Sequence, residues 1–140
     1  MAARAALGAV GRLFGRRRPT GPVPPAPLVV PRQTLDGWVL EGTPLARTVP
    51  RADQRELAHL LHSVGGRVDT PWTYSRAAEI LGAAGELVQA HAVTSAWLRH
   101  PASRSSEHAA ATRALAKAHD RIEARLAATD RSLDVQRANG

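Results

Sequence analysis

The chain has 140 residues, which is room for one small domain. It has no cysteine, which excludes disulfides, cysteine metal ligands and thiol nucleophiles, and no run approaches the roughly 18–20 apolar residues of a membrane-spanning helix. Its nineteen basic and twelve acidic side chains give a net charge of +7. With one Phe, one Tyr and three Trp, the core must consist mainly of Leu, Val, Ile and Ala, which favours closely packed helices.

The positive charge is concentrated at the N-terminus. Residues 1–32 carry six arginines and no acid, whereas residues 33–140 carry thirteen basic and twelve acidic groups. The high isoelectric point is therefore weak evidence that the folded domain itself binds nucleic acid.

Residues 1–18 are interpreted as a basic tail or a short amphipathic helix. A flexible tail would contact any polyanion, and a helix would lie on an anionic membrane or partner surface. A transit peptide also stays open, whereas a secretory signal is disfavoured because its charge should precede the apolar stretch. The predicted contacts to an anionic nucleic acid, membrane or protein are Arg4, Arg12, Arg16, Arg17 and Arg18.

Residues 19–49 are predicted to be a Pro-rich linker followed by a docking segment. The stretch 19–31 contains six prolines and is typical of a semi-rigid, partly polyproline-II spacer. Asp36 and Gly37 form a turn signal. The apolar residues from Trp38 to Leu40 fit either a short strand or a segment docked on the helices, and we favour docking because a lone hairpin is marginal in water.

Residues 50–140 are predicted to form a helical domain that begins with a short helix over 50–64. Pro50 suits its first turn, and Leu57, Leu60, Leu61 and Val64 form one apolar stripe. The glycines at 65 and 66 end it.

Two longer helices are predicted to follow, over 71–99 and 104–132. The break at Pro101 folds them into an antiparallel hairpin, so the fold class is mainly α, with a short helix, a long helical hairpin and an extended basic tail. Gly82 and Gly85 either allow close helix approach or split the first of these helices. The predicted helix-packing or oligomer interface comprises Ile80, Ala84, Leu87, Leu98, Ala111, Leu115, Ala118, Ile122 and Leu126.

This contact surface is rich in alanine and buries little apolar area, so the sequence predicts that something must cover it: the helix over 50–64 together with Trp38, or else another copy or a partner. The function that follows is a non-enzymatic interaction module: a structural subunit or adaptor of a larger assembly, such as that of a mobile element or phage. We expect a cytoplasmic protein or a component of an intracellular assembly. We expect no cofactor and no small-molecule substrate.

A helix-turn-helix DNA-binding protein, dimerised by its C-terminal helix, is the alternative hypothesis. The stretch 75–98 faintly resembles that motif, with the turn near Gly82. Against this reading, Glu86 would stand near DNA phosphates. The side chains predicted to contact DNA are Gln89, His91, Thr94 and Arg99.

The sequence disfavours a metal site and acid–base catalysis. Glu56 and His59 have the spacing of half a helical di-metal site, but no second such pair follows. Glu86, His91, His108, His119 and Glu123 could supply acid–base pairs, and the last two are i, i+4 neighbours, but no nucleophile accompanies them. Of Trp72 and Trp97, we expect one to be buried and the other to be an exposed interface anchor.

Overall fold

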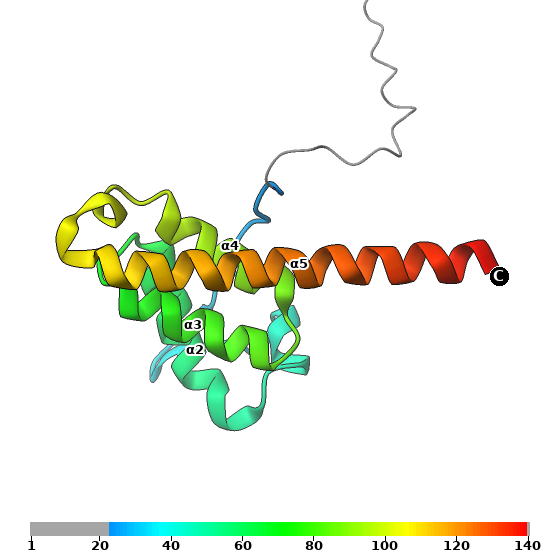
Figure 1. Cartoon of the computed structure of the whole chain (residues 1–140). Coiled ribbons are helices and arrows are strands. Elements are labelled where there is room, and N and C mark those ends of the chain that lie inside the picture. Colours follow the sequence, from blue (N-terminus) through cyan, green and yellow to red (C-terminus); the bar gives the residue numbers. More distant parts are fainter. Residues whose placement is uncertain (1–22, 140) are drawn as a thin grey trace, which may run out of the picture.

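The structure, a computed structural model, describes residues 23–139 and is mainly helical (Figure 1). The expectations for residues 1–18, including the five arginines of the tail, therefore lie outside the described residues. Within 23–139 there are one β-hairpin, three short 3-10 turns and four α-helices. The helices are α2 (Arg51–Gly65), α3 (Pro71–Ala83), α4 (Leu87–Leu98) and α5 (Ala109–Asn139).

A small β-hairpin precedes the helices. Strand β1 (Arg32–Thr34) pairs antiparallel with β2 (Gly37–Val39), and Gly37 takes a φ of +118° just after the turn. The hairpin also docks on α2, where the rings of Trp38 and His62 stack with centroids 3.8 Å apart. Strand and docking therefore coexist, because α2 supplies the support that an isolated hairpin lacks.

Helix α2 closely matches the helix predicted over 50–64. Its buried side chains include the four apolar residues of the predicted stripe. The Gln54 amide donates to the carbonyls of Ala46 and Val49, at 3.1 and 2.9 Å, and so ties the 3-10 turn η1 (Pro44–Arg47) to the helix.

The segment predicted as a helix over 71–99 is divided into α3 and α4, which is the second of the two alternatives left open for Gly82 and Gly85. Gly85 has a φ of +77°, a left-handed conformation that glycine adopts without a Cβ penalty. The Gly85 amide donates to the Gly82 carbonyl and the Glu86 amide to the Leu81 carbonyl, at 3.1 and 2.9 Å. This is the hydrogen-bond pattern of a Schellman helix end, so the predicted three-helix arrangement becomes four helices.

Helix α5 begins and ends later than the helix predicted over 104–132. Residues 101–108 form two 3-10 turns, η2 (Pro101–Arg104) and η3 (Ser106–His108), before α5 starts. Helices α4 and α5 lie antiparallel: the indole Nε1 of Trp97 donates to Thr112 Oγ1 at 3.0 Å, and His91 contacts Glu123 from the opposite end of α4.

Helix α4 is the most deeply buried element, covered by α3, α5 and the Pro-rich segment. Gln89 fastens that segment: its Oε1 accepts from the Val29 amide and its Nε2 donates to the Pro27 carbonyl, both at 2.8 Å. Residues 27–31 therefore dock on the domain and are not the spacer that the sequence predicted.

The outer end of α5 extends beyond the rest of the domain (Figure 1). Every residue from 128 to 139 is exposed, including Leu133 and Val135. Within residues 23–139, no helix has the length and apolar content needed to cross a membrane.

Candidate functional site

A groove of about 670 Å³ runs between α3 and α5. Trp72 stands at one end of its α3 wall, and 61% of that residue's surface is exposed. Small side chains and the buried residues Leu115 and Ile122 also line the groove. A Cβ added at Gly82 would have nothing within 4 Å, so the groove is open at this point of the wall.

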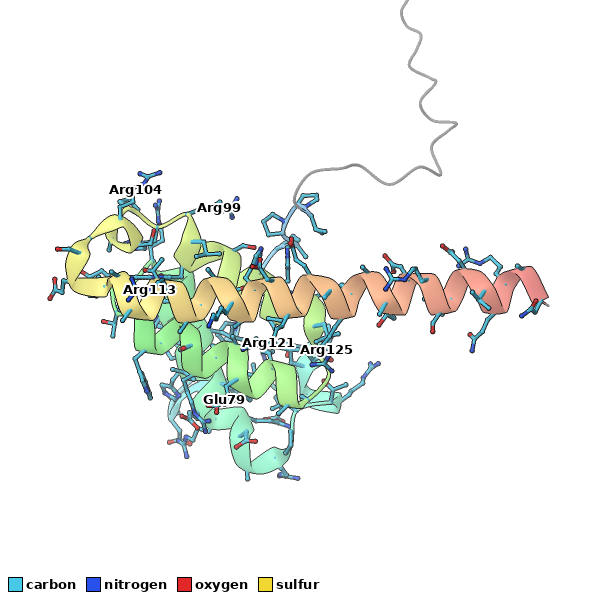
Figure 2. The ribbon with its side chains drawn as sticks, in the orientation of Figure 1. Glu79, Arg99, Arg104, Arg113, Arg121 and Arg125 are labelled. Carbon is cyan, nitrogen blue, oxygen red and sulfur yellow. The ribbon has the colours of Figure 1, made fainter. Side chains whose placement is uncertain are left out.

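The two walls of the groove differ in how their charges are compensated. On α3, Arg76 donates to both Glu56 oxygens at 2.9 Å and to Glu79 at 2.7 Å, so its charge is already paired. On α5, Arg121 and Arg125 lie on the side that faces α3 (Figure 2). Neither arginine has an ion-pair partner among residues 23–139.

The basic wall continues along α5. Arg113, Lys117, Arg121 and Arg125 follow one another at intervals of four residues, and all four are exposed. This spacing places the cations in one slowly turning row, about 6 Å apart along the helix axis. The groove therefore combines an apolar floor with a cationic edge.

The predicted packing residues divide between the core and the groove. Ile80, Leu115 and Ile122 are buried. The others are partly buried, and of these Ala118 lines the groove. The contact between α4 and α5 is covered from within the chain, by α3 and residues 27–31. Cover from within the chain was one of the two alternatives, but it comes from α3 and residues 27–31 and not from the helix over 50–64 with Trp38. The groove between α3 and α5 is a surface that stays open. The partly buried positions are Ala84, Leu87, Leu98, Ala111, Ala118 and Leu126.

The residues predicted to contact DNA do not share one exposed surface. Gln89, His91 and Thr94 are buried, because α4 is surrounded by other elements, and only Arg99 is exposed. In this conformation a recognition helix at α4 could not enter a DNA groove. The two tryptophans divide as expected: Trp97 is fully buried and Trp72 is exposed.

A second cluster joins α4 to α5 on the other side of the domain. The Nε2 atoms of His91 and His119 lie 3.0 and 3.4 Å from the same oxygen, Oε2 of Glu123. The two imidazole rings stack with centroids 4.6 Å apart. His119 Nδ1 lies 2.8 Å from Thr94 Oγ1, and the Val23 amide donates to Glu123 Oε2 at 3.3 Å. The sequence had paired His119 with Glu123, and the antiparallel register adds His91.

The cluster favours the ionised form of Glu123 and the neutral form of His119. The hydrogen bond from His91 is the main reason that the pKa of Glu123 is lowered, and the Val23 amide adds to it. Burial is the main reason that the pKa of His119 is lowered, and repulsion from His91 acts in the same direction. A cavity of about 230 Å³, which His91, Glu123, Leu126 and Asp130 help to line, adjoins the cluster.

The remaining candidates stay apart. Glu56 is engaged by Arg76, and the His59 Nδ1 faces the Arg55 carbonyl of its own helix at 2.9 Å. His108 packs edge-on against Trp97, with ring centroids 5.5 Å apart. No family model, curated protein or solved structure matches this chain.

Proposed function

We propose that this protein is a non-enzymatic interaction module that binds an acidic, amphipathic helix of a partner protein in the α3–α5 groove. The observation that carries the proposal is the combination, in one groove, of the exposed Trp72, the apolar floor and two cations, Arg121 and Arg125, that have no ion-pair partner between residues 23 and 139. Helix-in-groove recognition uses an apolar face for affinity and flanking charges for specificity.

The dimensions of the groove suit a short helix. Its α3 wall runs from Trp72 to Ala83, about 17 Å, or three helical turns. A partner helix of that length presents apolar anchors at i, i+3, i+4 and i+7. The small residues Gly82, Ala114 and Ala118 line the groove and let a second backbone approach closely.

The charge of the groove favours an acidic occupant over a second copy of this chain. The outer end of α5 offers the exposed apolar residues Leu133 and Val135, but residues 128–139 carry as many basic as acidic side chains. This end would therefore not match the cations in the groove of another copy. Nucleic acid would satisfy the cations but would leave the apolar floor and Trp72 without a counterpart.

A charge-swap titration tests the proposal. The probes are two dye-labelled 18-residue peptides with leucine at the four anchor positions, one bearing glutamate and the other lysine on the flanks. We expect the wild-type protein to bind the glutamate peptide at least about tenfold more tightly. The double change Arg121→Glu with Arg125→Glu should reverse this preference.

A second variant tests the groove and leaves its charge unchanged. Gly82→Leu fits the folded chain, because the added Cβ meets nothing within 4 Å, and it fills space that the partner helix would use. We expect it to weaken binding of the glutamate peptide without lowering thermal stability. The matched control is Ala128→Leu on the exposed end of α5. Unchanged binding in Gly82→Leu, or dimerisation that this substitution abolishes, would contradict an acidic helix as the occupant.

A further inference from the structure

The His91–His119–Glu123 cluster has a geometry that hydrogen bonding alone does not require. Two imidazole nitrogens, from different helices, converge on one carboxylate oxygen, and the three potential ligand atoms all lie within 4.8 Å of one another. We propose that these side chains form a binding site for a single divalent transition-metal ion, with Zn²⁺ as the best match.

The distances are close to those of a coordination sphere. With metal–ligand bonds of about 2.0–2.1 Å, neighbouring ligand atoms of a tetrahedral site lie about 3.3 Å apart. The two nitrogen-to-oxygen distances here are 3.0 and 3.4 Å. Because the two rings are stacked, admitting an ion requires His119 to tilt until both Nε2 lone pairs point at the ion. Two histidines and one carboxylate form a ligand set that suits zinc, whereas calcium and magnesium prefer oxygen ligands alone.

The surroundings of the cluster support the ligand role of His119. The Thr94 hydroxyl lies 3.2 and 3.1 Å from the carbonyls of Ala90 and His91, to which it can donate, and 2.8 Å from His119 Nδ1. When that hydroxyl donates to a carbonyl, it accepts from Nδ1–H, which leaves the Nε2 lone pair pointing toward the site. Ligating histidines in proteins commonly have such a hydrogen-bonded second nitrogen.

The site has one protected side and one open side. His91 is 2% exposed and so is held by its packing on α4. On the other side lies the cavity of about 230 Å³, which His91 and Glu123 also line. Three protein ligands and a cavity leave room for a water as the fourth ligand. An ion there would join α4, α5 and, through the Val23 amide on Glu123, the Pro-rich segment.

The test uses the full chain without an affinity tag, stripped with a chelator and then titrated with Zn²⁺. At a protein concentration of about 10 µM, we expect one equivalent of Zn²⁺ to saturate the site, which corresponds to a Kd of about 1 µM or below. Co²⁺ in the same site should give the intense visible absorption of tetrahedral cobalt. Saturating Zn²⁺ should also raise the melting temperature.

Three variants and one control assign the site. His119→Ala and the nearly isosteric Glu123→Gln should each weaken Zn²⁺ binding at least about 100-fold. Loss of a residue that only hydrogen-bonds to a ligand costs about 10–100-fold, and loss of the ligand itself should cost more. Thr94→Ala should weaken it about tenfold. His59→Ala removes one exposed imidazole elsewhere and should leave the Kd unchanged.

The proposal is overturned if the wild-type protein takes up no Zn²⁺ at these concentrations. It is equally overturned if Glu123→Gln, shown to be folded by circular dichroism, binds as tightly as wild type. The cluster is then a metal-free hydrogen-bonded joint between α4 and α5.

Discussion

Trp97 should be the largest single contributor to stability among the aromatic residues of the described chain. It is fully buried, and the centroid of its ring lies 5.2 Å from that of Tyr74 on α3. Its indole N–H donates a hydrogen bond to the Thr112 hydroxyl on α5. Trp97→Ala therefore removes contacts to two helices at once. Truncation of a buried tryptophan to alanine costs about 3–5 kcal/mol.

That loss is a large part of the total for a domain of this size. Small domains are stable by about 5–15 kcal/mol, and 1 kcal/mol lowers the melting temperature by about 4–8 °C for 60–100 residues. We expect Trp97→Ala to melt at least about 10 °C lower, or to be unfolded at 37 °C. The measurement is urea and thermal unfolding followed by circular dichroism at neutral pH.

Trp72→Ala is the matched control, since it deletes the same side chain from an exposed site. Most of its surface is already in water, so its unfolding free energy should change by no more than about 0.5 kcal/mol. Equal destabilisation by the two substitutions would refute the assignment of Trp97 to the core and of Trp72 to the groove.

Three further predictions concern the helix end at Gly85, the ion pairs of Arg76 and the outer end of α5. Gly85→Ala should destabilise the domain by about 1–2 kcal/mol, because alanine is strained at a φ of +77°. Gly82→Ala, three residues earlier, should be neutral or stabilising by up to about 1 kcal/mol in the same urea titration. Arg76→Gln should lower stability at pH 7, and this deficit should shrink at pH 3. The sign follows because the hydrogen bond from Arg76 lowers the pKa of Glu56 below its ordinary 4.5, so the stabilisation is present above that pH and is lost as Glu56 becomes protonated. A deficit that persists unchanged at pH 3 would contradict this role for the ion pair. Ending the chain at Arg131 should change the free energy of unfolding, measured from the urea midpoint, by no more than about 0.5 kcal/mol, because every residue from 132 to 139 is exposed. Those residues should also exchange their amide hydrogens fastest within α5, and strong protection there would show that another surface covers them.

The periodicity of the sequence predicted the mainly helical class and most of α2. It left two outcomes open at Gly85, because a glycine in an apolar helical pattern is compatible with both close packing and a helix end. The deciding factor is the left-handed conformation at Gly85, together with the hydrogen bonds that the amides of Gly85 and Glu86 donate to the carbonyls of Gly82 and Leu81.

The candidate sites were only partly predictable for a similar reason. The spacing of His119 and Glu123 places them on one turn of a helix, and the sequence shows this directly. That His91 reaches the same carboxylate depends on the register between α4 and α5. The groove depends on α3 lying beside α5, which no local pattern in the sequence specifies.

Because of the two hydrogen bonds between the Gln89 side chain and the backbone of Pro27 and Val29, the folding unit starts upstream of the helices. A chain that begins at Arg51 would keep all four helices and yet uncover one side of α4, leaving the Gln89 amide without its backbone partners. Trimming the protein to its helical part should therefore give a poorly soluble fragment that aggregates. A minimal version for crystallisation or binding studies should begin before Pro27.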